Sequence, residues 1–185
     1  MLTFIGYIIQ LMIKPQRGWE DLAKADFSAR RLLVSGLIPL ILLTAAVSFV
    51  RISYFSDYTW VDALQDAVIN AVTFFGTYFI ATFLLSLRLP YMQTEPGDSA
   101  ENNNKVDIFS AGIVGILLLI TLVSNLIPLD ISLLQYLPLY SAYVIWKGAP
   151  YLGIAKENIG QFMIIAVASL IIPVYALGYF FHLFT

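Results

Sequence analysis

The chain has 185 residues, of which 59% are hydrophobic and only 12% are charged. A soluble domain carries about 25% charged residues, so the composition predicts a protein whose apolar surface is covered by a bilayer. The formal net charge is −2 without a basic tract, which argues against a nucleic-acid partner. Cysteine is absent and His182 is the single histidine, so we predict no cofactor and no metal centre.

The N-terminal segment, residues 1–31, is expected to lie at the membrane surface. Residues 1–13 are apolar but lack the basic start and the small-residue cleavage site of a signal peptide. Thirteen residues are too few to cross a hydrocarbon core of about 30 Å, so an interfacial helix is predicted. Packing of this segment against the bundle is the alternative. Residues 14–31 are the most charged stretch and predict a short amphipathic helix or a solvated elbow.

The remainder, residues 32–185, predicts an all-α bundle of five transmembrane helices. Pro39 should kink the first span, and Pro173 and Gly178 should interrupt the last. Ala111 and Gly115 form a small-xxx-small pair in the third span, which would let another helix approach closely. Residues 88–107 predict a flexible, aqueous, cytoplasmic loop. The five predicted spans are residues 32–50, 66–87, 108–127, 131–146 and 161–184.

A polar stripe runs into the membrane along the second span. Asp66, Asn70, Thr73 and Thr77 follow one another at helical spacings and therefore share one face. Such a stripe suits a pathway for an ion or a polar substrate. It suits equally well hydrogen bonding and close packing between helices, which is the more common use of hydroxyl and amide side chains in membranes.

Residues 133–154 hold a second helical face that carries chemistry. Tyr136, Tyr140 and Tyr143 share this face, and Lys147 continues it at the end of the helix. Buried tyrosines need hydrogen-bond partners for their hydroxyl groups. We interpret the face first as an inward packing surface that lies near the polar stripe, and second as a candidate chemical site.

Aromatic and basic residues predict how the bundle is placed in the membrane. Trp19, Trp60 and Trp146 are expected to anchor it at headgroup depth. With five spans and a cytoplasmic N-terminus, Arg51 alone is external and nine basic residues are cytoplasmic. This bias predicts a multi-pass protein of a bacterial inner membrane with an external C-terminus. The nine are Lys14, Arg17, Lys24, Arg30, Arg31, Arg88, Lys105, Lys147 and Lys156.

Two segments and the five-span layout resemble the Yip family of Ypt/Rab-interacting membrane proteins, in particular its short bacterial members. The segments are residues 13–20, IKPQRGWE, and residues 138–148, PLYSAYVIWKG. The resemblance implies a five-helix integral membrane protein without known catalytic residues. The long cytosolic region and the Asp-Leu-Tyr-Gly-Pro motif of eukaryotic members are missing here, so their trafficking role and site residues do not carry over.

Three functions follow from these patterns. The first is a non-enzymatic membrane scaffold or interaction protein that forms a homo-oligomer or binds another membrane protein. The second is a small transporter, channel or transporter subunit that uses the polar stripe. The third is a protein that binds a lipid in a groove between helices. An intramembrane enzyme is not predicted, because the sequence offers no nucleophile paired with a base and no acidic dyad within a span.

Overall fold

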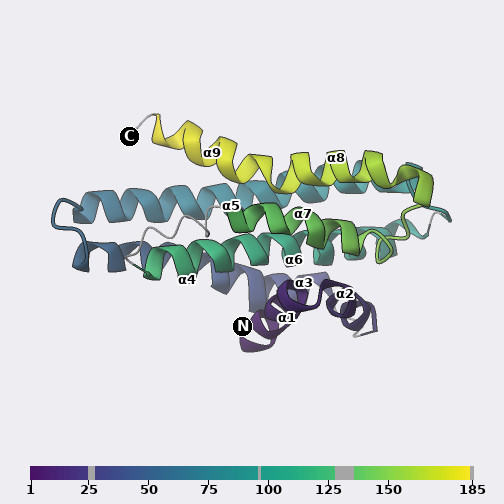
Figure 1. Ribbon diagram of the computed structural model, residues 1–185, viewed down its shortest axis with the longest axis horizontal. Helices are drawn as coiled ribbons and strands as arrows, with labels where there is room; N and C mark the ends of the chain where they lie inside the picture. Colours follow the sequence, from purple (N-terminus) through teal and green to yellow (C-terminus); the bar gives the residue numbers. More distant parts are fainter. Residues whose placement is uncertain (25–27, 96, 128–135, 184–185) are drawn as a thin grey trace.

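The computed structural model describes residues 1–24, 28–95, 97–127 and 136–183. The described residues form an all-α bundle without a strand (Figure 1). The α-helices are α1 (Leu2–Ile13), α2 (Pro15–Lys24), α3 (Ala29–Leu32), α4 (Ile38–Val47), α5 (Trp60–Arg88), α6 (Ser99–Leu126), α7 (Leu137–Gly148), α8 (Ile159–Leu170) and α9 (Ile172–His182). The shorter turns are η1 (Leu33–Leu37), η2 (Ser48–Ser53), η3 (Leu89–Tyr91) and η5 (Lys156–Asn158).

Four continuous helical stretches are long and apolar enough to cross a membrane. They contain the first and second spans predicted from the sequence and cover most of the third and fifth, which were predicted to end at residues 127 and 184. The stretch that includes α6 is the most enclosed of the four, and α6 packs against α1, α4, α5 and α7. The protein is therefore a multi-pass membrane protein built around α6. The stretches are Ala29–Ser53, Trp60–Tyr91, Ser99–Leu126 and Lys156–Phe181.

The fourth predicted span is present only as the shorter helix α7. Its 12 residues rise about 18 Å, less than the hydrocarbon core, and residues 131–135 of the prediction lie outside the described part of the chain. Helix α7 nevertheless leads the chain back toward the end of the bundle at which α6 begins. The Met92 carbonyl oxygen accepts from the Ala155 amide at 2.9 Å and from Asn158 Nδ2 at 3.2 Å, so α6 and α8 both start at the same end of the bundle. Helix α7, which lies between α6 and α8 in the sequence, therefore runs back along the long axis (Figure 1).

Two of the three predicted helix breaks are confirmed. Pro39 has no amide proton for the preceding turn, and η1 lies immediately before it as a wide, π-helical turn. Pro173 follows the break between α8 and α9 at Ile171. Gly178 instead lies inside α9 without a break, because a single glycine weakens a helix but leaves its hydrogen bonds intact.

The predicted loop of residues 88–107 is wrong in length and character. η3 extends the second long helix to Tyr91, and α6 already begins at Ser99. Asn102 is buried, and its amide group exchanges two hydrogen bonds with Gln93, at 2.9 and 3.0 Å. Asn104 Oδ1 accepts from the Ala29 amide at 2.8 Å. The polar residues that suggested a solvated loop are therefore used to join helix ends.

The N-terminal helix packs against the bundle and is not simply laid on the membrane. Phe4, Ile8 and Leu11 of α1 are buried. A Cβ atom added to Gly115 would lie 2.6 Å from Ile8 Cδ1, and one added to Gly36 would lie 2.6 Å from Phe4 Cγ. The close approach of another helix is confirmed at Gly115 of the predicted Ala111 and Gly115 pair, and the helix that approaches is α1. The packing alternative for residues 1–13 thus replaces the interfacial prediction.

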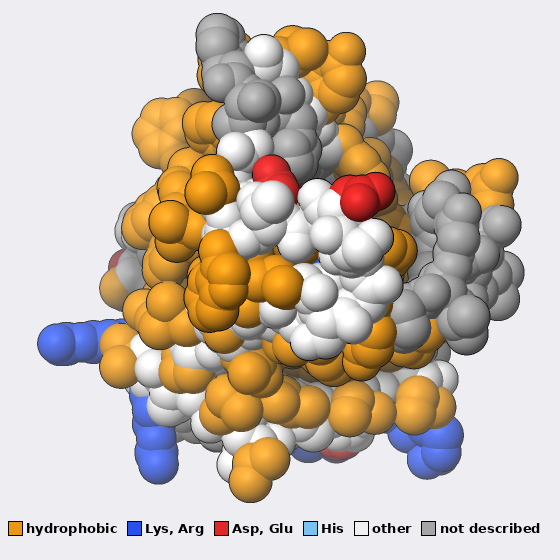
Figure 2. All heavy atoms as spheres, turned by 90° about the vertical axis from the view of Figure 1, so that its left-hand side faces the viewer, with side chains coloured by type: hydrophobic (Ala, Val, Ile, Leu, Met, Phe, Trp, Pro, Cys, Tyr) orange, Lys and Arg blue, Asp and Glu red, His pale blue; other side chains and the backbone are white. Residues whose placement is uncertain are grey.

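Basic residues gather at one end of the bundle, which we call the basic end. It comprises the start of α3, the turn between η3 and α6, and the turn between α7 and α8, which the hydrogen bonds above bring together. Nine of the ten lysine and arginine residues belong to α1–α3 or flank these turns, and only Arg51 belongs to the opposite end. Viewed from that opposite end, the protein shows mainly hydrophobic and uncharged side chains with some acidic side chains among them, and basic side chains project at its edges (Figure 2).

A candidate functional cleft at the basic end

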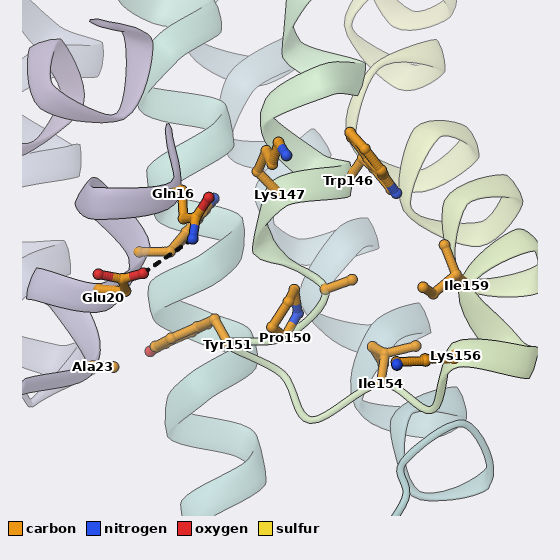
Figure 3. Close-up of a pocket in the computed structure, with 12 residues that line it drawn as sticks. Gln16, Glu20, Ala23, Trp146, Lys147, Pro150, Tyr151, Ile154, Lys156 and Ile159 are labelled. Atoms are coloured by element: carbon orange, nitrogen blue, oxygen red, sulfur yellow. Dashed lines mark hydrogen bonds between the residues drawn. The ribbon is translucent and has the colours of Figure 1, made fainter. Parts of the chain in front are cut away.

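An open cleft of about 580 Å³ lies at the basic end between α2, α7 and the start of α8. Figure 3 shows Gln16 and Glu20 of α2 on one side of it and Ile159 of α8 on the other. Its volume falls in the range typical of small-molecule sites, about 300–1,000 Å³. The residues that give the cleft its chemistry are Trp19, Glu20, Trp146, Lys147, Tyr151 and Lys156.

Trp19 builds the inner wall of the cleft by joining three segments of the chain. Its indole Nε1 donates a hydrogen bond to the Val144 carbonyl oxygen at 3.0 Å. Its ring stacks on Phe109, with ring centroids 4.9 Å apart, and on Tyr151, at 5.4 Å. Only 2% of Trp19 is exposed. The headgroup-facing role predicted for Trp19 is therefore wrong, because its ring anchors α2 to α6 and α7 and does not reach lipid.

Lys147 and Trp146 form the upper part of the cleft together. The Lys147 ammonium lies 4.4 Å from the centroid of the Trp146 ring and 5.6 Å from that of Tyr143. These cation–π contacts hold the ammonium at the cleft without neutralising its charge. Trp146 itself is 45% exposed, as its predicted role as an interface anchor requires.

The floor of the cleft is the turn between α7 and η5. Gly153 adopts a left-handed conformation with φ of 69°, which a residue with a side chain rarely adopts. Gln93 Nε2 donates to the Leu152 carbonyl oxygen at 2.9 Å, and the Thr94 amide donates to that of Gly153 at 3.1 Å. Burial raises the pKa of Tyr151, so its hydroxyl stays protonated and can serve as a donor.

The predicted polar stripe lies elsewhere, on the part of α5 that packs along α4 and η2. Asp66 accepts hydrogen bonds from Arg51, at 2.8 Å, and from Tyr58. Burial and the bond to Asp66 raise the pKa of Tyr58, which keeps that donor in place. Asn70 Nδ2 lies 3.4 Å from Ser48 Oγ. Asp66 and Asn70 of the stripe thus make contacts with η2 and with the turn that precedes α5.

The two remaining stripe residues are enclosed in the protein. Thr73 and Thr77 are buried, and their hydroxyl groups have no hydrogen-bond partner among the residues that the structure describes. No described cleft is lined by either residue. The described geometry therefore favours packing over a conducting pathway for this stripe.

The tyrosine face of α7 does not point as a whole into the bundle. Tyr136 is 64% exposed and Tyr143 is 43% exposed, so these two rings face the surroundings. Tyr140 alone is directed inward and donates a hydrogen bond to the Met12 carbonyl oxygen at 2.8 Å. The expected proximity to the polar stripe is wrong, since α7 packs mainly against α2, α6 and α8. The reason is that α2 packs against a side of α7 that would have no neighbour if the five predicted spans alone formed the bundle.

Trp60, the third predicted anchor, is exposed at the start of α5 at the opposite end. It follows Thr59, whose side chain forms a capping box with Asp62 and so begins the helix six residues before the predicted start. The signal for this start, a Thr followed three residues later by an acid, is visible in the sequence. The acid of the box is aspartate, whereas the usual pattern has Glu or Gln.

Sequence reasoning missed the pairing of Asp107 with Tyr78. Asp107 was assigned to the aqueous loop, but it lies within α6, and its carboxylate is hydrogen-bonded to the Tyr78 side chain of α5. Sequence reasoning also missed the cleft, because its walls come from segments more than 120 residues apart. Among the described residues, no cluster of three or more His, Cys, Asp or Glu side chains is arranged to hold a metal ion.

The whole chain was also compared with known proteins. No family model, no curated protein and no solved structure matches this sequence. The resemblance to the Yip family therefore stays a prediction. What can be said of function comes from the geometry of the chain itself, which is that of a multi-pass helical membrane protein with an aromatic, basic cleft at one end.

Proposed function

We propose that this protein is a non-enzymatic membrane protein that binds a lipid in the cleft at its basic end. The observation that carries the proposal is the 580 Å³ opening with tryptophan and lysine at its rim. Amphipathic tryptophan rings and long lysine side chains are the groups that proteins place at headgroup depth. A ligand with a polar head and an apolar tail suits such a site.

The surface next to the cleft suits the tail of such a ligand. Tyr136, Leu139, Tyr143 and Trp146 are all exposed and follow one another at spacings of three, four and three residues. They form one apolar stripe on α7 that leads from the cleft toward the middle of the bundle. An acyl chain along this stripe would cover apolar surface that neighbouring helices leave open.

We place the basic end on the cytoplasmic side of the membrane. The concentration of nine basic residues at one end and a single arginine at the other supports this orientation. The cleft then opens at the cytoplasmic leaflet. Scaffolding, which the sequence favoured, remains compatible with this role, because a protein that holds a lipid also organises the bilayer around it. Transport has less support, since Thr73 and Thr77 of the polar stripe are buried and line no described cleft.

The proposal is tested by counting lipids that stay bound during purification. The protein is extracted from membranes in a mild detergent and weighed by native mass spectrometry, and we expect one retained phospholipid per chain. Ala23→Trp adds a large ring to an exposed residue of the cleft wall and should reduce the retained lipid at least severalfold.

Ala100→Trp provides the matched control. It places the same ring at an exposed site of the basic end that does not line the cleft. Lipid retention should match that of the parent protein. Equal retention in Ala23→Trp, or a parent protein that carries no lipid, would rule out the cleft as a lipid site.

A further inference from the structure

The cleft holds an excess of positive charge. Among the residues that line it, Lys147, Lys156 and Glu20 are charged, which leaves a net charge of +1. Within the described part of the chain, the two ion pairs formed are Arg51 with Asp66 and Lys105 with Glu101, so neither cleft lysine is neutralised by a carboxylate. Unpaired ammonium groups beside an apolar surface attract an anion.

The two lysines reach the cleft from different elements. Lys147 comes from the last turn of α7 and is held over the Trp146 ring, while Lys156 starts η5 beyond the turn. Figure 3 shows Lys147 at the top of the cleft and Lys156 at its lower right, with Pro150 between them and Tyr151 on the left. A phosphate in the cleft is therefore attracted by ammonium groups from two elements, and the protonated Tyr151 hydroxyl also lines the cleft.

The acidic residue of the cleft limits how much negative charge it accepts. Glu20 lies on the α2 side, where its Oε1 accepts a hydrogen bond from Gln16 Nε2 at 3.3 Å. This carboxylate repels an anion, so a headgroup with several phosphates is disfavoured relative to one phosphodiester. Basic pockets between membrane helices on the cytoplasmic side are known sites for acidic headgroups.

We propose that the ligand of this cleft is an acidic phospholipid with a single phosphodiester, whose phosphate lies between Lys147 and Lys156 and whose acyl chain follows the exposed stripe of α7. The inference rests on the proposed lipid-binding function and adds the chemical class of the headgroup. It also assigns opposite roles to the charged residues: the lysines strengthen binding and Glu20 weakens it.

The test measures affinity for two lipids that differ in headgroup charge. Delipidated protein in a neutral detergent is titrated with short-chain phosphatidylglycerol and with phosphatidylcholine of the same chain length, and binding is followed by tryptophan fluorescence. We expect phosphatidylglycerol to bind at least tenfold more tightly. Lys147→Gln and Lys156→Gln should each weaken its binding about fivefold, which corresponds to about 1 kcal/mol per charge near a membrane surface.

Three further variants make the test specific. Glu20→Gln should tighten phosphatidylglycerol binding severalfold, because a repelling charge is removed. Lys147→Arg keeps the charge and should restore most of the affinity, which separates charge from folding defects. Lys105→Gln changes the net charge equally, but Lys105 is paired with Glu101 outside the cleft, so its affinity should equal that of the parent.

Each other outcome overturns a defined part of the inference. Equal affinity for both lipids, unchanged by the lysine variants but lost in Ala23→Trp, would leave a lipid site and reject the acidic headgroup. Glycerol 3-phosphate or inorganic phosphate that binds as tightly as phosphatidylglycerol would reject a lipid as the source of the anion. Failure of both lipids to bind would reject the proposed function itself.

Discussion

Gly148 is the residue at which the wall of the cleft is packed most tightly. A Cβ atom at this position would lie 2.5 Å from Phe109 Cε2 and 2.9 Å from Trp19 Cε2, closer than atoms of these rings can approach. Both rings are buried and stacked on each other, so neither can move aside without losing that contact. The absence of a side chain here is therefore what lets α2 and α6 meet at α7.

Gly148→Ala should destabilise the protein by about 1–3 kcal/mol, the usual cost of inserting atoms into a packed core. Unfolding in mixed micelles with increasing denaturing detergent measures the change. Gly160→Ala is the control, since nothing lies within 4 Å of the added atom and alanine favours the helix. A Gly148→Ala variant as stable as Gly160→Ala would show that the rings are not held as described.

At the scale of elements, α1 packs so closely against two glycines that neither position has room for a side chain. Gly36 and Gly115 each accept a side chain of α1 where their own Cβ would be. The spacing of Ala111 and Gly115 predicted a close approach, because small residues permit one. Which helix approaches could not be predicted, since a small residue does not specify its neighbour.

The docking of α1 can be measured with engineered cysteines, because the chain has none of its own. A Cβ on Gly36 would lie 2.8 Å from Phe4 Cβ, so a shift of about 1 Å brings the pair Phe4→Cys and Gly36→Cys to the Cβ–Cβ distance of a disulfide, which should form on oxidation. Adding Gly115→Leu fills the space of Ile8 and should sharply reduce the crosslinked fraction seen on a gel.

Gly178→Leu in α9 is the matched control, because a Cβ atom added there meets nothing within 4 Å. It should leave the crosslinking yield unchanged. An unaltered yield with Gly115→Leu would mean that α1 is held without the contact to α6, and the structural description of this helix would need revision.

At the scale of the whole molecule, the number of crossings decides which turns share a side of the membrane. The hydrogen bonds between residues 92–94 and 153–158 place these two turns at one end, although four helices in the described part of the chain are long enough to span. The short helix α7 is therefore part of a return crossing.

Single cysteines should report this arrangement in intact bacteria that express the protein. We expect Ser56→Cys to react with a membrane-impermeant maleimide, and Asp98→Cys and Glu157→Cys to react only after the cells are permeabilised. The positive-inside orientation supplies the direction. Labelling of Glu157→Cys together with Ser56→Cys would contradict the return through α7, and a fully reversed pattern would contradict the orientation alone.

The class of protein, the long apolar helices and the breaks at Pro39 and Pro173 can all be predicted from the amino-acid sequence. Hydropathy and the missing amide proton of proline are properties of a residue and its near neighbours, so they can be read along the chain. Capping by Thr59 and Asp62 is equally local and was readable in principle.

The burial of Trp19, the outward direction of Tyr136 and Tyr143, and the existence of the cleft follow from the tertiary packing and could not be predicted from the sequence. A helix face becomes internal when another element covers it, and the covering element here is α2, whose partners lie more than 120 residues away. Periodicity identifies a face but not its neighbour. Contacts between distant segments depend on how all the helices pack at once, and that information is absent from any local pattern.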